Sequence, residues 1–156
     1  MSDKKRFGVM LDCSRNAVMK PEQVKKFVDY ISAFGYNCIQ LYTEDTFEVD
    51  GEPYFGYLRG RYTKDELKNI DAYCAKKGVE LIPCVQTLAH VNQIFRWNEY
   101  ASTVRDTGDI LLADEPRTYA LIENIFKTLA ECFTSRTVNI GMDEAHLLGR
   151  GKYLDK

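Results

Sequence analysis

Short runs of apolar residues alternate along the chain with segments in which apolar residues recur every three or four positions. The runs cover residues 7–11, 37–42, 79–85 and 137–141. Apolar runs of this length are typical of buried strands, whereas the longer spacing is typical of amphipathic helices. We therefore predict the order βαβαβαβ, with parallel strands covered by helices either in a barrel or in a doubly wound sheet.

Local signals mark where the intervening helices begin and end. Pro21 and Pro116 each stand at the start of a helical pattern, a position that suits proline because its missing N–H is not needed there. Thr63 and Glu66 have the spacing of a capping box at the start of another helix. Gly35 and Gly78 follow the first two helices, so we expect those helices to stop there.

The connections have unequal lengths. Turns from helix to strand are short, whereas the segments 43–62 and 86–115, which lead from strand to helix, exceed the usual length of about 2 to 6 residues. The long connecting segments therefore all lie at the edge of the sheet where the strands end. In parallel α/β proteins that carboxyl edge is where sites are built.

Polar side chains gather behind each predicted strand. They are Asp12, Ser14, Arg15, Asn16, Glu44, Asp45, Gln86, His90, Asn92, Asp143, Glu144 and His146. The adjacent carboxylates Asp143 and Glu144 suit acid/base chemistry, in which one stays protonated as a general acid and the other stays ionised and stabilises charge. The alternative is a helix start, with Asp143 as the cap and Glu144 in the first turn.

Composition limits the class of protein. The 156 residues are 45% hydrophobic and 28% charged, which suits one globular domain. A net charge of -2 without a clustered basic face gives no footprint for nucleic acid or an anionic membrane. We find no signal peptide and no apolar run near the ~18 residues of a membrane span, so we expect a cytoplasmic protein. The five cysteines, an odd number without CxxC spacing, read as buried small hydrophobes.

Several motif-based chemistries find no support. No glycine-rich phosphate fingerprint follows any predicted strand, which disfavours a nucleotide-binding fold. No serine or cysteine stands in a GxSxG elbow, so covalent serine chemistry is not supported either.

Four segments together resemble a known family. They are Leu11-Asp12-Cys13-Ser14-Arg15, Gln40-Leu41-Tyr42-Thr43-Glu44-Asp45, Ile82-Pro83 with His90, and Ile140-Gly141-Met142-Asp143-Glu144. In order and spacing they resemble glycoside hydrolase family 20, the exo-β-N-acetylhexosaminidases. The resemblance implies a (β/α)8 TIM-type barrel. It also implies hydrolysis of terminal β-linked N-acetylglucosamine or N-acetylgalactosamine with retained configuration, on an amino-sugar glycoside, with no cofactor and no metal.

The resemblance also implies roles for single residues. In that family the 2-acetamido oxygen of the substrate attacks the anomeric carbon, an exception to the usual pair of catalytic carboxylates. Glu144 matches the group that protonates the glycosidic oxygen, and Asp143 the group that orients the acetamide. Arg15 matches an arginine that holds ring hydroxyls, and Asp45 and His90 match second-line positions near Glu144, where they would tune its pKa and relay protons. The resemblance thus places Arg15, Asp45 and His90 in the substrate-binding site.

The chain departs from the family pattern at two places. Asn16-Ala17 stands where His-Phe is usual, and residues 83–90 keep only the proline and the histidine of the family's third-strand motif. These departures indicate a divergent branch.

Length is the other departure from the family. A barrel of this type has about 250 residues and at least about 200, whereas this chain has 156. We therefore expect residues 1–156 to form the N-terminal half of the catalytic domain, with about four β/α units. Such a half-barrel leaves strand edges open, so we expect self-association and incomplete activity. Apolar side chains would then face water from among Val9, Leu11, Ile39, Leu41, Leu81 and Ile140.

Two other functions stay open. A metal-dependent sugar isomerase or hydrolase would bind a divalent cation through ligands from the same carboxyl edge, namely Asp12, Glu44, Asp45, His90 and Glu144. A half-barrel that binds carbohydrate without turning it over is the second.

Overall fold

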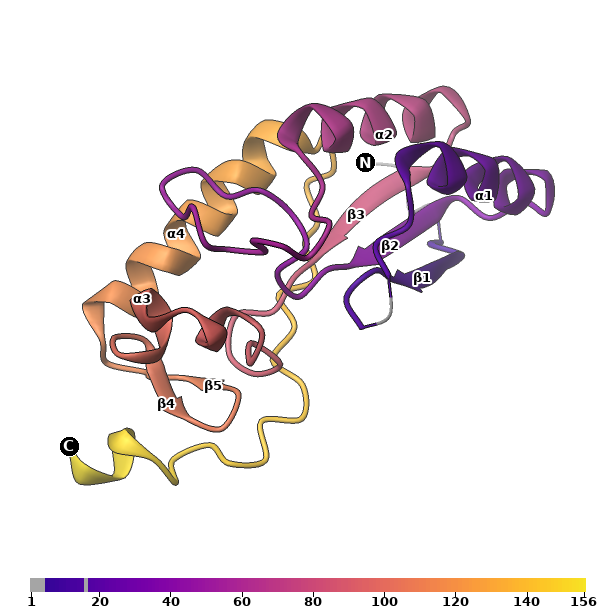
Figure 1. Cartoon of the computed structure of the whole chain (residues 1–156). Coiled ribbons are helices and arrows are strands. Elements are labelled where there is room, and N and C mark those ends of the chain that lie inside the picture. The colour runs from indigo at the N-terminus through magenta and orange to yellow at the C-terminus, as the bar shows by residue number, and fades with distance from the viewer. Residues whose placement is uncertain (1–4, 16) are drawn as a thin grey trace.

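Three parallel strands form the centre of the computed structural model, which describes residues 5–15 and 17–156 (Figure 1). The order in the sheet is β1 (Gly8–Asp12), β2 (Cys38–Tyr42) and β3 (Glu80–Cys84). The main helices are α1 (Pro21–Ala33), α2 (Lys64–Lys76) and α4 (Pro116–Cys132). The predicted alternation of strands and helices is thus confirmed for the first three strands. Asn16, which we grouped with the candidate polar residues, lies outside the described residues.

The helices cover one face of the sheet and leave the other open. Figure 1 shows α1 and α2 above the strands and α4 running down from beside α2, and α2 contacts both α1 and α4. Ile39, Leu41 and Leu81 are therefore buried. Ile140, from the same predicted set, is 42% exposed, so the expectation that this set includes water-facing residues is confirmed. The open face also carries Met10, which is 52% exposed.

The helix starts form as the local signals predict. Pro21 and Pro116 are the first residues of α1 and α4. At α2 the backbone N–H of Glu66 donates to the Thr63 hydroxyl at 3.1 Å, and the backbone N–H of Thr63 donates to the Glu66 carboxylate at 2.9 Å. This reciprocal capping box satisfies two backbone donors that the helix itself cannot pair.

The predicted fourth strand forms only in part. Residues 137–141 lie beside β3 through one parallel bridge between Cys84 and Asn139, and the backbone N–H of Thr87 donates to the Gly141 carbonyl at 3.3 Å. The backbone of Asn139 donates to the Pro83 carbonyl at 2.9 Å and accepts from the Val85 N–H at 3.0 Å. Continuing this ladder toward the strand start would need an N–H from Pro83, which proline lacks.

The long segment after β3 contains elements that the apolar pattern did not predict. It forms a turn of 3-10 helix (Ile94–Arg96), the short helix α3 (Asn98–Ala101) and a hairpin of β4 (Arg105–Thr107) and β5 (Ile110–Leu111). The C-terminal 3-10 turn (Lys152–Asp155) runs back beside this hairpin, where the backbone N–H of Tyr153 donates to Asp106 at 2.8 Å (Figure 1). These elements are too short to give a periodic signal.

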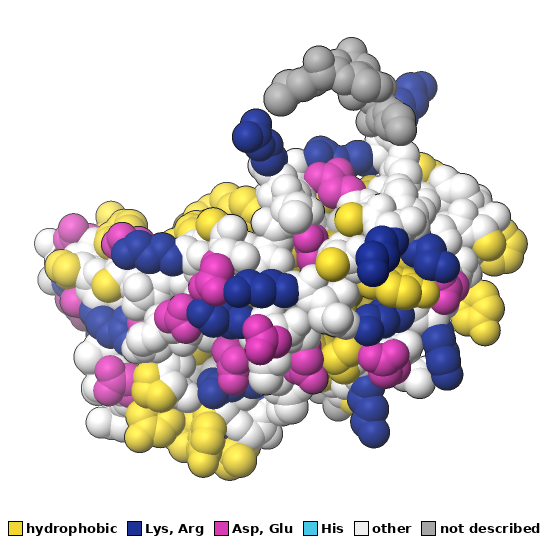
Figure 2. Space-filling view, turned by 90° about the horizontal axis from the view of Figure 1, so that it is seen from above, with side chains coloured by type: hydrophobic (Ala, Val, Ile, Leu, Met, Phe, Trp, Pro, Cys, Tyr) yellow, Lys and Arg dark blue, Asp and Glu magenta, His cyan; other side chains and the backbone are white. Residues whose placement is uncertain are grey.

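Surface charge and cysteine burial agree with the composition. Figure 2 shows lysine and arginine side chains interspersed with acidic ones over the visible face, rather than a field of one sign. All five cysteines are buried and free, as predicted. Among the described residues, no helix has both the length and the apolar character that crossing a membrane requires.

A buried ion pair holds the long loop after β2 against α4. The Glu52 side chain is only 1% exposed, and the Arg117 guanidinium donates to its two carboxylate oxygens at 2.8 and 2.6 Å. Asn124 of α4 and the Tyr100 hydroxyl of α3 also donate to it, at 3.0 and 3.1 Å. Because α3 and α4 both donate hydrogen bonds to its carboxylate, Glu52 fixes the relative positions of both long loops and α4.

Removing the cationic partner should therefore destabilise the fold strongly. We expect Arg117→Ala to lower the free energy of unfolding by about 3 to 5 kcal/mol, because it leaves a buried carboxylate without its cation. Urea denaturation of the 156-residue chain measures this loss. The matched control is Lys127→Ala, also on α4, whose ion pair with Glu123 is exposed and whose loss should leave the transition nearly unmoved. Equal denaturation midpoints for the two variants would show that Glu52 does not hold the loops.

Candidate active site

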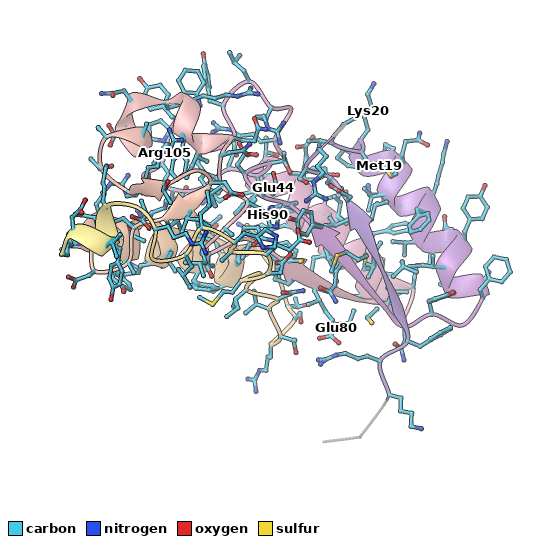
Figure 3. All side chains as sticks on the ribbon, turned by 90° about the horizontal axis from the view of Figure 1, so that it is seen from below. Met19, Lys20, Glu44, Glu80, His90 and Arg105 are labelled. Atoms are coloured by element: carbon cyan, nitrogen blue, oxygen red, sulfur yellow. The ribbon has the colours of Figure 1, made fainter. Side chains whose placement is uncertain are left out.

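The register of the sheet brings the strand ends into one row. Asp12 pairs with Tyr42, Tyr42 pairs with Cys84, and Cys84 bridges to Asn139. Parallel strands in register end at the same edge, so the residues that follow them must meet there. Figure 3 shows Glu44 and His90 next to each other at this edge, and Glu80, the first residue of β3, at the opposite end.

Asp12 and Arg15 form one side of the candidate site. The Asp12 carboxylate accepts from the backbone N–H and the hydroxyl of Ser14, at 2.8 and 2.7 Å, which closes a tight turn after β1. Burial opposes ionisation of Asp12, but these hydrogen bonds and the Arg15 guanidinium leave its pKa below the usual value. Arg15 lies over the Tyr42 ring, 5.6 Å from its centroid, and within 3.9 Å of Glu44.

Glu44 and Asp45 are adjacent but face different groups. The Tyr42 hydroxyl donates to Glu44 at 3.3 Å, whereas Asp45 pairs with the Arg59 guanidinium at 3.1 Å. Burial raises the pKa of both carboxyls, with Arg15 opposing the rise at Glu44 and Arg59 at Asp45. Glu44 therefore belongs to the group around Tyr42, and Asp45 is bound to the loop that follows β2.

Gln86 connects two parts of the site. Its amide nitrogen donates to the Tyr42 hydroxyl at 3.0 Å and to the Asp143 carboxylate at 3.1 Å. Tyr42 is buried, and its burial together with the Glu44 charge raises the pKa of Tyr42 to about 12. The result is a continuous chain of hydrogen bonds from Glu44 through Tyr42 and Gln86 to Asp143.

The Asp143-Glu144 pair projects from a sharp turn. Gly141 opens that turn with φ +51°, and a Cβ there would lie 2.3 Å from the Val85 carbonyl oxygen, so only glycine fits. The hydrogen bond from Gln86 lowers the pKa of Asp143 and holds it ionised near neutral pH. Neither carboxylate caps a described helix, so the helix-start interpretation is wrong.

His90 stands between the two carboxylates. Its Nε2 atom is buried, lies 3.5 Å from Asp143 Oδ2 and 3.3 Å from Glu144 Oε2, and makes no hydrogen bond among the described residues. Asp109, in the turn of the β4–β5 hairpin, accepts from the His90 backbone N–H at 3.1 Å. The hairpin that the sequence did not predict thus positions the histidine.

A hollow of about 320 Å³ lies among these groups. It is lined by Met10, Asp12, Arg15, Tyr42, Asp143 and Glu144. Its volume is at the lower end of the range for ligand pockets. Of the predicted site residues, Arg15, Asp143 and Glu144 line the hollow. His90 does not line it but contacts both carboxylates. Asp45 does not line it either, and pairs with Arg59.

One group in the described part of the chain could hold a metal ion. It comprises His90, Asp143 and Glu144, whose ligand atoms all lie within 4.8 Å of one another. This set overlaps only partly with the ligands expected for a metal enzyme, because Asp45 is engaged with Arg59. A histidine and two carboxylates are a donor set that several divalent transition metals accept.

Tyr42, Gln86 and Arg59 take part in the site, although the sequence predicted no role there for any of them. Gln86 is among the polar residues grouped after the predicted strands, whereas Arg59 is not. Arg59 comes from the middle of a loop, and its guanidinium donates both to Asp45 and to the Ser14 carbonyl. The glycines on both sides of it, Gly56 and Gly60, indicate turns in this loop, but they do not reveal the partner of Arg59. Contacts across such sequence distances have no local pattern.

The raised pKa of Glu44 has a consequence for stability. A carboxyl whose pKa is higher in the folded than in the unfolded state stabilises the fold when protonated, and that contribution is lost as pH rises through the folded pKa. We therefore expect Glu44→Gln to gain stability relative to wild type as pH rises from below 4.5, the ordinary glutamate value, toward neutrality. Urea denaturation across this pH range measures the difference.

An exposed carboxyl with the opposite shift provides the control. Lys127 lowers the pKa of Glu123, so Glu123→Gln should lose stability relative to wild type over the same rise in pH. A Glu44→Gln variant that changes with pH in the same direction as Glu123→Gln would contradict the burial assigned to Glu44.

Comparison with known proteins connects this geometry to a family. The chain is 27% identical to a beta-hexosaminidase of Akkermansia muciniphila, over 93% of the chain and 36% of that protein. A solved structure of the GH20 exo beta-N-acetylglucosaminidase of Vibrio harveyi, in complex with N-acetylglucosamine, superposes with TM-score 0.84 at 18% identity, over 94% of the chain and 29% of that protein. The N-acetyl-beta-hexosaminidase of Streptomyces plicatus, in complex with Thio-NAglucal, gives TM-score 0.77 at 25% identity, over 89% and 32%.

These relatives are much longer than the chain. It spans about a third of the length of the curated relatives it matches. The model of glycosyl hydrolase family 20, catalytic domain, matches residues 6–152, nearly the whole chain. The similarity to family structures also supports a barrel-type α/β fold, of which the described residues show a part with parallel strands. On this match the chain belongs to the catalytic domain of glycosyl hydrolase family 20.

Proposed function

We propose that the chain supplies the acid and the acetamide-orienting group of a β-N-acetylhexosaminidase. The reaction is hydrolysis of terminal non-reducing β-linked N-acetylglucosamine or N-acetylgalactosamine by a substrate-assisted, retaining mechanism. The observation that carries the proposal is the Asp143-Glu144 pair, which lines a sugar-sized hollow and stands beside His90. Family membership and the named activities of the relatives support it.

The geometry suits a division of labour between the two carboxylates. Asp143 is held ionised by Gln86 and can accept a hydrogen bond from the acetamide N–H. This turns the acetamide oxygen toward the anomeric carbon and stabilises the positive charge that develops on the acetamide nitrogen as the oxygen attacks. Glu144 protonates the glycosidic oxygen as the bond breaks and later takes a proton from the attacking water. His90 Nε2, 3.3 Å from Glu144, is near enough to exchange a proton with it.

Arg15 and its neighbours suit the hydroxyl groups of the sugar. The guanidinium lines the hollow as a rigid fork of donors, held by Asp12 at 3.6 Å and stacked over Tyr42. Pre-positioned donors of this kind bind ring hydroxyls without reorganising. Asp45, which pairs with Arg59, would act at a distance by fixing the loop behind the site.

We further propose that residues 1–156 are the N-terminal half of the barrel domain, with about four β/α units. The open face of the sheet and the single bridge of residues 137–141 fit a sheet that continues. The walls that would enclose the sugar on its remaining sides would then come from further strands. The cytoplasmic location expected from the sequence stays a prediction.

Substitution of the two carboxylates tests the catalytic roles. In the polypeptide encoded by the complete open reading frame, Glu144→Gln should reduce turnover of an unactivated N-acetylglucosaminide by ~10²-fold or more, because the proton donor is lost. An aryl glycoside with a good leaving group needs less protonation and should suffer less. Asp143→Asn should slow both substrates, because acetamide participation weakens.

The same assays separate the proposal from its alternatives. Wild-type rates for both variants on both substrates would contradict the catalytic assignment. Sugar binding by the wild type without turnover of either substrate would identify the carbohydrate-binding alternative instead.

A metal-dependent sugar isomerase or hydrolase is the second candidate, favoured by the group of His90, Asp143 and Glu144. In that case the cation would polarise a sugar oxygen, and all three side chains would be ligands. Elemental analysis of the purified protein, with assays before and after chelation, separates the two functions. Activity that is lost on chelation and restored by a divalent cation would replace the glycosidase proposal.

We also propose that the chain on its own associates with a second copy through its open sheet. β1 is an edge strand, and exposed apolar side chains lie on the open face and on the C-terminal segment, at Met10, Ile140, Met142 and Leu148. Unpaired strand edges and exposed apolar surface favour pairing. Light scattering at micromolar concentration should give a mass above 18.0 kDa, and a stable monomer would contradict the proposal.

A further inference from the structure

Three aromatic rings form a partly exposed cluster that the proposed reaction does not use. Tyr54 and Trp97 are stacked, with centroids 5.4 Å apart and an interplanar angle of 25°. Tyr57 packs edge-on against Trp97 at 5.3 Å, so all three rings meet. Tyr54 and Tyr57 remain 43% and 46% exposed. We call these three residues the aromatic platform.

The platform joins two loops that the fold holds rigidly. Tyr54 and Tyr57 follow Glu52 in the long loop after β2, and Trp97 precedes Tyr100 of α3. The Tyr100 hydroxyl donates to Glu52 at 3.1 Å, which ties the two loops together directly beside the rings. Rings held in this way lose little conformational entropy when a ligand binds to them.

The platform is connected to the edge of the site by close backbone contact. A Cβ on Gly56, between the two tyrosines, would lie 2.0 Å from the Asp45 carbonyl oxygen, so the loop lies directly against the end of β2. Two residues beyond Tyr57, Arg59 donates to Asp45 and to the Ser14 carbonyl. The backbone at Ser14 joins Asp12 to Arg15, both of which line the catalytic hollow.

We propose that the aromatic platform is a carbohydrate subsite that stacks against a sugar ring of the substrate on the leaving-group side of the scissile bond. The inference rests on the proposed glycosidase function. The hollow of about 320 Å³ has room for little more than the terminal sugar, so the rest of an oligosaccharide must lie along the surface beyond it. The loop that carries Tyr54 and Tyr57 touches the backbone of Asp45, which follows the end of β2.

The chemistry of the rings matches a neutral sugar. One face of a pyranose ring is formed by C–H groups, which bury apolar area against an aromatic face, while its hydroxyls stay free to bond to water or to tyrosine hydroxyls. Aromatic rings that stay partly exposed on a rigid support are typical of surfaces that bind ligands. The occupant should therefore be an oligosaccharide of N-acetylglucosamine with at least two residues, rather than the monosaccharide.

Trp97 is the only tryptophan in the chain, so its fluorescence reports on the platform directly. The 156-residue chain would be titrated with N-acetylglucosamine and with the β-1,4-linked trimer. We expect the trimer to change Trp97 emission in a saturable way and the monosaccharide to change it little. Tyr54→Ala should weaken the apparent affinity for the trimer about tenfold, because it removes the ring that extends the stacking surface.

The control is Tyr30→Ala, which removes an exposed tyrosine from α1 and should leave the trimer affinity at the wild-type value. An emission that does not respond to the trimer, or that responds equally in wild type and Tyr54→Ala, would overturn the subsite. A change in emission that follows protein concentration but not sugar would identify the platform as a contact between copies and also overturn it.

These outcomes are distinct from failure of the proposed function. Glu144→Gln leaves the platform intact, so this variant should keep the Trp97 response while turnover falls. A Trp97 response to the trimer together with unchanged turnover in the Glu144 and Asp143 variants would refute the catalytic roles and leave the subsite standing. Loss of turnover in those variants, with no Trp97 response to the trimer, would refute the subsite and leave the catalytic roles standing.

Discussion

The parallel register of three short strands is the constraint on which the site depends. Because Asp12 lies opposite Tyr42 and Tyr42 opposite Cys84, every segment that leaves the sheet starts from the same edge. The bridge from Cys84 to Asn139 adds a fourth segment to that row. A shift of one residue in any pairing would turn Asp12 or Tyr42 toward the helices and remove it from the site.

Hydrogen bonds connect the polar side chains at this edge of the sheet, from Glu44 through Tyr42 and Gln86 to Asp143. Gln86 holds Asp143 and Tyr42 together, and the same contact lowers the pKa of Asp143. Burial has the opposite effect on Glu44, whose pKa is raised. Carboxyls in one small region thus differ in their tendency to ionise because some accept hydrogen bonds from the protein and others are mainly desolvated.

Most of the framework could be predicted from the sequence because its signals are local. The capping box at Thr63, the prolines at Pro21 and Pro116 and the first three apolar runs all act within a few residues. The fourth strand forms only in part for a reason that lies in another segment, since Pro83 lacks the N–H that would extend its pairing. The family motifs brought Arg15, Asp143, Glu144 and His90 together correctly as neighbours, but not the contacts of Asp45 with Arg59 or of His90 with Asp109. Those partners lie in long loops whose fold depends on tertiary contacts.

We propose that this edge of the sheet holds the terminal amino sugar against Asp143 and Glu144. A crystal structure of the 156-residue chain soaked with N-acetylglucosamine would test this placement. We expect the sugar in the hollow between Arg15 and the carboxylates, with its acetamide nitrogen within hydrogen-bonding distance of Asp143 and with Arg15 bound to its ring hydroxyls. A sugar bound elsewhere on the chain, or an acetamide group turned away from Asp143, would contradict it.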